Sequence, residues 1–191
     1  MNKIFYWGMA AGILLIILIF FGLASYNALY NLSSDKFTVK TASLIGLPVG
    51  FVNSHYLSYK DFQNDLRAVR NFYDFQKKQN PDFTTPALAE LQKSVWERMA
   101  RQVVLAEQAK LANITVTPEE LDREFDKVIK ELGSAEKAEQ MLNDTYGWGS
   151  EQFKNKVLMP FLLQEKLAKA TNAPDLEEAY KKSKVWKWIK I

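Results

Sequence analysis

The chain has no cysteine and only one histidine among its 191 residues. The lack of cysteine excludes disulfides, thiolate nucleophiles and cysteine-based metal sites, and one histidine cannot build a histidine-rich metal site. A formal net charge of +3 is too mild to indicate a nucleic-acid-binding protein. Glycine-rich phosphate loops are also missing, because the one candidate, "GWGS" at 147–150, is typical of a turn. The sequence therefore predicts no metal, no nucleotide cofactor and no nucleic-acid partner.

The single histidine, His55, lies in "GFVNSHYLSYKDF", residues 50–62. Nucleophilic catalysis needs a base held beside a serine or cysteine, and no motif places such a partner near His55. Its position between an expected strand and an expected helix is typical of a solvated turn residue. The acidic residues that crowd 119–126 alternate with Arg123 and Lys127, which indicates a solvated helix face rather than a metal or acid–base site. We therefore predict no catalytic residues and no enzyme activity.

The N-terminus carries a long uncharged run, "IFYWGMAAGILLIILIFFGLA", from Ile4 to Ala24. A helix of this length spans roughly 31 Å, about the thickness of one bilayer core. Lys3 precedes the run, which favours an N-terminus in the cytoplasm and a soluble domain outside. Residues 1–25 are therefore expected to be a single-pass signal anchor in the cytoplasmic membrane, with residues 4–24 in the lipid bilayer. A signal peptide cleaved near "GLA" at 22–24 is the alternative.

Residues 26–46 follow the anchor and contain the polar cluster "NLSSDK", so we expect a juxtamembrane linker there. A short strand is predicted at about Val49–Val52, because Pro48 suits a strand start and the residues after it are β-prone. Asn53-Ser54 suits a turn. Ser58, with Asp61 three residues later, predicts the capped start of the first helix of the domain.

Apolar residues at helical spacing predict a central helix over about 86–112. Thr85 and Pro86 suit its cap and first turn, and Asn113 suits its C-terminal end. The apolar stripes of this helix are wide, which indicates that other elements pack on it from more than one side.

Two further helices have clear end signals. One is expected to begin with Thr117 as N-cap and to stop at Gly133. A last long helix, over about 151–170, contains Pro160, which should kink it or break it into two pieces.

The tail, residues 173–191, has five lysines and no acidic residue from Lys181 onward. Its segment "VWKWIKI" could pair with the strand at Val49–Val52, or it could lie on an anionic membrane surface.

The order of these elements resembles the N-terminal chaperone domain of the SurA/PrsA/PpiD-like family, over roughly residues 47–172. Three segments carry the resemblance: "VN" at the end of the strand, "VWERMARQVVLAEQAKLANITVTPEE" at 95–120, and "GWGSEQFKNKVLMPFLLQEKL" at 147–167. Asn113 stands where the family usually has glycine. Family members commonly carry a parvulin-type prolyl isomerase domain after this region, whereas only about 20 residues follow Ala170 here. The resemblance therefore implies a chaperone module without isomerase activity.

The expected fold is mainly α, with an N-terminal transmembrane helix, a SurA-N-like multi-helix domain and one or two short β-strands. The resemblance implies a membrane-tethered, ATP-independent holdase that binds unfolded or nascent translocated polypeptides. Alternatives are a truncated or split prolyl isomerase, and a structural adaptor of a membrane complex. Exposed aromatic and methionine side chains would supply the contact area. The candidate peptide-binding residues are Phe72, Tyr73, Phe75, Phe83, Trp96, Met99, Trp148 and Phe153.

Overall fold

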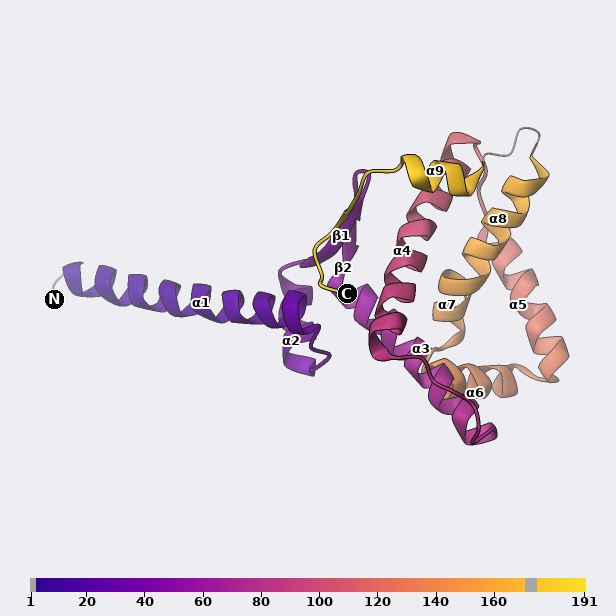
Figure 1. Ribbon diagram of the computed structural model, residues 1–191, viewed down its shortest axis with the longest axis horizontal. Coiled ribbons are helices and arrows are strands. Elements are labelled where there is room, and N and C mark those ends of the chain that lie inside the picture. The colour runs from indigo at the N-terminus through magenta and orange to yellow at the C-terminus, as the bar shows by residue number, and fades with distance from the viewer. Residues whose placement is uncertain (1–2, 171–174) are drawn as a thin grey trace.

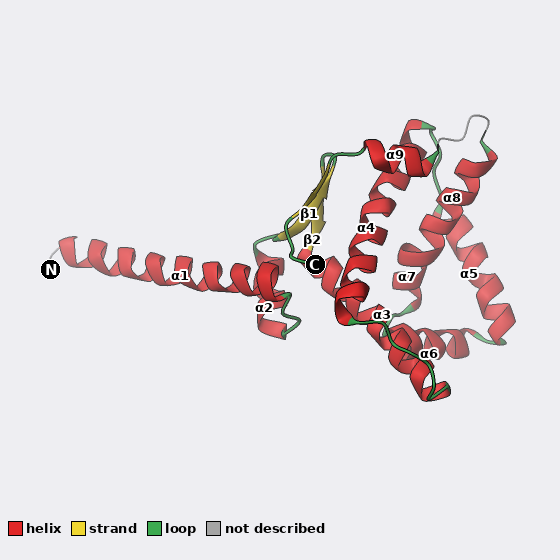
Figure 2. Ribbon diagram, in the orientation of Figure 1, coloured by secondary structure: helices red, strands yellow, loops and turns green. Residues whose placement is uncertain are grey.

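The computed structural model describes residues 3–170 and 175–191, and of residues 3–14 and 16 it describes the backbone alone. Within this part the chain is mainly helical with a few short strands, as the sequence predicts. A long helix projects from a bundle of shorter helices, and a small sheet lies where the two parts meet (Figure 1; Figure 2). Three short strands are described where one or two were expected.

The projecting helix, α1 (Lys3–Asn31), is followed at once by a second helix, α2 (Lys36–Leu44). Residues 26–46, for which a linker was expected, are therefore helical over most of their length. Asp35 caps α2, because its carboxylate accepts a hydrogen bond from the Thr38 amide at 2.9 Å. The β-branched residues of α2 have low helix propensity, so the sequence did not predict this helix. Packing against α1 stabilises it in the fold.

The predicted membrane anchor, Ile4–Ala24, falls largely on residues whose side chains lie outside the described part of the chain. Among the residues that were described, no helix is both long enough and apolar enough for a membrane span. The anchor stays a prediction.

The sheet has the strand order β2-β1-β3, with β1 (Pro48–Val52) antiparallel to both β2 (His55–Ser58) and β3 (Val185–Lys187). The pairing of β1 with β3 is the strand arrangement considered above for the tail. Gly50 permits it, because a Cβ there would collide with the Trp186 backbone carbonyl. His55 belongs to a strand and not to the turn, which is formed by Asn53 with a φ of 52° and Ser54.

The main core lies between the sheet, α1, α2, α3 (Tyr59–Gln79) and α4 (Leu88–Leu111). Ser58 caps α3 as predicted, since its hydroxyl accepts from the Asp61 amide at 3.0 Å. The structure begins α4 at Leu88, with Ala87 as N-cap, so Thr85 does not cap it. The buried residues of this core are Ala28, Leu32, Ala42, Val49, Val52, Leu57, Tyr59, Phe62, Leu66, Leu91, Val95, Trp96, Met99, Ala100, Val104 and Ile189.

A second, smaller core is formed by α5 (Pro118–Leu132), α6 (Ala135–Tyr146) and the helix that follows them. Thr117 caps α5 in a capping box with Glu120, and Gly133 ends it in the left-handed conformation, as predicted. The buried residues of the second core are Leu121, Phe125, Ala138, Leu142, Leu158 and Leu162.

The last long helix runs as α7 (Ser150–Phe153), a π-helical turn η1 (Lys154–Leu158) and α8 (Met159–Lys169). Pro160 neither stops nor splits it; the turn before the proline widens instead. Pro160 lacks the N–H that would bond the Lys156 carbonyl, and Gln102 Nε2 of α4 approaches that oxygen at 3.4 Å. After residues 171–174, which lie outside the described part, α9 (Leu176–Lys182) leads into β3.

Candidate functional site

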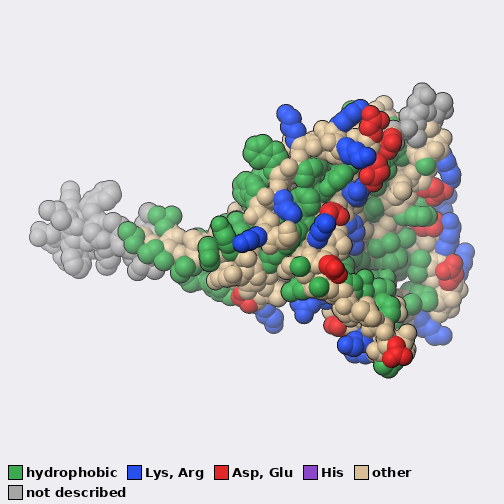
Figure 3. Space-filling model, in the orientation of Figure 1, with side chains coloured by type: hydrophobic (Ala, Val, Ile, Leu, Met, Phe, Trp, Pro, Cys, Tyr) green, Lys and Arg blue, Asp and Glu red, His purple; other side chains and the backbone are tan. Residues whose placement is uncertain are grey.

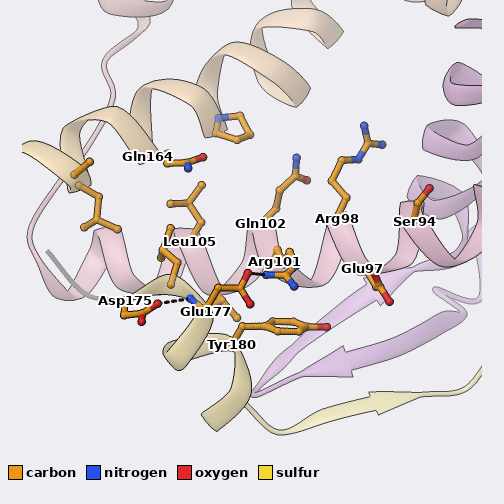
Figure 4. Close-up of a pocket in the computed structure, with 15 residues that line it drawn as sticks. Ser94, Glu97, Arg98, Arg101, Gln102, Leu105, Gln164, Asp175, Glu177 and Tyr180 are labelled. Atoms are coloured by element: carbon orange, nitrogen blue, oxygen red, sulfur yellow. Dashed lines mark hydrogen bonds and ion pairs between the residues drawn. The ribbon is translucent and has the colours of Figure 1, made fainter.

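A cleft of about 860 Å³ lies between α4, α8 and α9. This volume falls in the range of small-molecule and peptide sites in proteins. Figure 4 shows how the labelled side chains from α4 and α8 approach each other across it, with α9 along its other side. Its lining residues are Ser94, Glu97, Arg98, Arg101, Gln102, Val104, Leu105, Pro160, Gln164, Leu167, Ala168, Asp175, Leu176, Glu177 and Tyr180.

The cleft exists because α4 presents different residues to its two sides. Val95, Met99 and Ala100 contribute to the main core, while Arg98, Arg101 and Leu105 line the cleft. Leu105 is buried at the cleft, and Gln102 and Arg98 rise beside it (Figure 4). The wide apolar stripes seen in the sequence therefore serve two packing surfaces, of which one remains partly open.

The α9 wall is fixed to α4 through Arg101. Its guanidinium pairs with the Glu177 carboxylate and lies 4.5 Å from the centre of the Tyr180 ring. Burial raises the pKa of the Tyr180 hydroxyl above its ordinary value. Asp175 caps α9 by accepting from the Glu177 amide at 2.9 Å. These contacts hold a short helix in place at the mouth of the cleft.

The lining combines apolar side chains with polar groups that are neutral or of both charges. Leu105, Pro160 and Leu167 offer an apolar surface, and the side-chain amides of Gln102 and Gln164 can each donate and accept hydrogen bonds. Such a surface can take up apolar side chains of an extended chain and bond its backbone without reading its sequence. The arrangement is suited to binding.

A buried carboxylate fixes the helices behind the cleft. Asp65 of α3 is 1% exposed, and its oxygens lie 3.2 Å from Arg98 Nη2 and 3.1 Å from Lys156 Nζ. The pairs are close enough for strong attraction but fall outside hydrogen-bond geometry. Because Arg98 comes from α4 and Lys156 from the π-helical turn, this triad joins three helices at one point. No sequence pattern predicts this triad.

None of the eight predicted peptide-binding residues lines this cleft. Trp96 and Met99 are buried in the main core, and Phe153 packs on the second core against Phe125. Phe75 is half-buried in α3. The cleft residues were missed because they are mostly polar. Their one sequence signal is the spacing of Ser94, Arg98 and Gln102 along one line of α4.

The other four predicted residues, Phe72, Tyr73, Phe83 and Trp148, form a row of neighbouring rings with Tyr146. Along the row the ring centres are 5.8 Å apart for Phe83 and Tyr73, 5.5 Å for Tyr73 and Phe72, 5.9 Å for Phe72 and Tyr146, and 5.3 Å for Tyr146 and Trp148. Phe72 and Trp148 also line a smaller pocket of about 250 Å³. The row joins α3 to α6 and packs the two cores together, so it has a structural role in this fold.

His55 has one polar partner among the described residues. Its Nδ1 lies 3.1 Å from Glu107 Oε1, and the other oxygen of that carboxylate accepts from Asn53 Nδ2 at 2.5 Å. These bonds tie the β1–β2 turn to α4. Within the described residues no group of three or more acidic or histidine side chains could hold a metal ion.

The family model for the SurA-like N-terminal domain matches residues 3–147 of this chain. The match includes α1 and the α4 wall of the cleft, whereas α8 and α9 lie beyond it. Neither a curated protein nor a solved structure matches the chain.

Proposed function

Because this chain belongs to the family of SurA-like N-terminal domains, we propose that it is a membrane-tethered holdase chaperone. In this proposal α1 anchors it in the cytoplasmic membrane, with its N-terminus inside and the helical domain on the extracytoplasmic side. The domain binds unfolded segments of newly translocated proteins without ATP and without catalysing a reaction. The observation that carries the proposal is the open cleft between α4, α8 and α9, joined to the family's chaperone character.

The lining supports the binding of varied, unfolded chains. A holdase has to recognise many sequences weakly, so it needs apolar surface for client side chains and hydrogen-bonding groups for client backbones. Leu105 and Leu167 supply the first, and Gln102 and Gln164 supply the second. Glu97 and Arg101 add charges of both signs, which avoids excluding clients of either net charge.

A cleft-filling substitution tests the site. Ala168 is exposed on α8 and lines the cleft, so Ala168→Trp should fill it without disturbing either core. Ala89→Trp, at an exposed alanine in the first turn of α4 away from the cleft, is the matched control. With the full chain in nanodiscs, we expect Ala168→Trp to lose suppression of client aggregation and Ala89→Trp to retain it. Equal suppression by the two variants would remove the cleft from the proposal.

Crosslinking separates a chaperone from a structural adaptor. A benzoyl-phenylalanine placed at Gln164 should capture many unfolded translocated proteins in cells. Capture of one fixed partner, with no unfolded client, would contradict the holdase. The same placement at Met141, an exposed residue of α6, reports background capture.

The tether has its own test. The chain has no cysteine, so one engineered cysteine gives an unambiguous label. In spheroplasts, Asn80→Cys should react with a membrane-impermeant maleimide, because Asn80 is exposed at the end of α3. Protection of this position until the membrane is dissolved would place the domain in the cytoplasm and contradict the proposed topology.

A further inference from the structure

The outer surface of the sheet carries a row of aromatic side chains, one from each strand, of which Phe51 is half-buried and the others are exposed. Phe51 of β1 stands opposite Tyr56 of β2 and opposite Trp186 of β3, so the three share one face. Trp188 extends the row, with its ring centre 5.2 Å from that of Phe51. Tyr56 is 59% exposed, Trp186 65% and Trp188 49%. We call these four residues the aromatic face; exposed apolar surface of this kind marks an interaction site.

The position of the aromatic face relative to α1 is fixed by the fold. Ala24 and Ala28 of α1 are buried, as is Leu32 directly after it, and Phe20 contacts Phe37 at the start of α2 with ring centres 4.9 Å apart. The Tyr59 hydroxyl donates to the Ser33 carbonyl at 2.6 Å, directly beyond the end of α1. The helix is therefore built into the domain, and its direction sets the direction of the sheet.

The sheet lies at the base of α1, beside α2, at the end of the bundle from which α1 projects (Figure 1). Figure 3 shows hydrophobic side chains gathered over this end of the molecule. A bilayer that holds α1 over Ile4–Ala24 ends near Phe20 and Ala24, and the contact with Phe37 brings α2 to the same level. The aromatic face then stands close to the lipid headgroups.

The charges around the aromatic face suit an anionic bilayer. Residues 179–191 contain five lysines and no acidic residue, and α2 adds Lys36 and Lys40. Of these, Lys184 and Lys190 are exposed on either side of the two tryptophans. Tryptophan and tyrosine rings are favoured at the headgroup level, and nearby lysines are attracted to anionic lipids.

We propose that the aromatic face is a second membrane contact, which docks the domain onto the anionic headgroup surface of the bilayer that holds α1. The proposal rests on the proposed tether. It gives the domain one fixed orientation on the membrane, since α1 and the sheet are parts of one packed unit. A client emerging at the membrane surface would then meet the cleft from a constant direction.

Fluorescence quenching by lipid tests the contact. The full chain is reconstituted in vesicles of brominated phosphatidylcholine, with or without phosphatidylglycerol, and carries an environment-sensitive label on Tyr56→Cys. Met141→Cys, exposed on α6, is the matched control. We expect brominated lipid to quench the fluorescence of a label at Tyr56→Cys strongly in anionic vesicles, and that of a label at Met141→Cys only weakly. Replacing Lys184 and Lys190 by glutamine should lower the ratio of docked to undocked protein about 30-fold, from the usual effect of two lysines at a membrane surface.

Different results would contradict the proposed membrane tether and the proposed docking of the aromatic face. Release of the protein from vesicles by alkaline carbonate would show that α1 is not inserted, and the proposed function would fall. Retention in carbonate with equal quenching on Tyr56→Cys and Met141→Cys would overturn the docking proposal alone. Disulfide crosslinking between two copies of Tyr56→Cys, or shielding of the label only when unfolded client is added, would also overturn it, because a second copy or a client would then cover the face.

Discussion

The buried triad of Asp65, Arg98 and Lys156 makes an asymmetric prediction about stability. The carboxylate is 1% exposed, whereas the Arg98 and Lys156 side chains are 37% and 32% exposed. Loss of the carboxylate therefore leaves two cations that can turn toward water. Loss of both cations leaves a carboxylate that has no route to water.

The magnitudes follow from this difference in burial. Arg98→Met with Lys156→Met strands a buried charge, which costs about 3–5 kcal/mol in the free energy of unfolding. Asp65→Asn leaves a buried amide with imperfect partners, which costs about 1–3 kcal/mol. The triple variant Asp65→Leu/Arg98→Met/Lys156→Met leaves neither a buried charge nor a buried amide. Its free energy of unfolding should be close to that of the wild-type protein, because apolar packing often stabilises a fold as well as a buried ion pair does.

Urea unfolding of the full chain in one mild detergent, followed by far-ultraviolet circular dichroism, measures these differences. The control is Glu165→Gln, which breaks the exposed pair of Glu165 with Lys169 and should leave the midpoint unchanged. The order expected is Arg98→Met/Lys156→Met least stable, Asp65→Asn intermediate, and the triple variant close to wild type. If Asp65→Asn were as unstable as the double variant, the argument from burial would be wrong.

Three further predictions concern the main core and the π-helical turn. Leu32→Ala should lower the free energy of unfolding by about 2–5 kcal/mol in the same urea assay, because Leu32 is buried in the main core, while Leu44→Ala at an exposed site should not. Burial raises the pKa of Tyr59 from 10.0 to about 12, so between about pH 10 and 12 the unfolded chain loses a proton that the folded chain keeps. The free energy of unfolding should therefore fall as pH rises through this window, and it should fall less steeply in Tyr59→Phe. Gln102→Ala leaves the Lys156 carbonyl without its side-chain donor, so hydrogen–deuterium exchange should quicken in η1 and the start of α8, with little change in α5.

The helices that could be predicted are those whose ends carry strong local signals. Thr117 and Gly133 bound α5 through a capping box and a left-handed glycine, and both are decided by a few neighbouring residues. Asn113 likewise ends α4 with a φ of 54°. In contrast, α2 depends on its packing against α1, and no local pattern in residues 36–44 announces it.

The candidate site was harder to predict for a different physical reason. Large aromatic and methionine residues were favoured as binding contacts, but in a domain of this size they are also needed to fill the cores, and Trp96 and Met99 fill the main core. The cleft arises where helices distant in the sequence fail to close over α4, and most of the residues that line it carry polar groups. Only the relative placement of α4, α8 and α9 reveals it, and that placement depends on contacts such as Arg101 with Glu177.

The junction between α1 and the domain changes what a membrane tether means for this chain. A flexible linker would leave the cleft free to point in any direction, and its length would set only the reach of the domain. Here Ala24 and Ala28 put one side of α1 into contact with the domain, and Leu32, directly after the helix, is buried in the main core. Under the proposed tether, the long apolar run would contain two overlapping patterns, one for lipid and one for protein. Because both lie on a single helix, any tilt that the bilayer imposed on α1 would be passed to the sheet and to α4, and through them to the cleft.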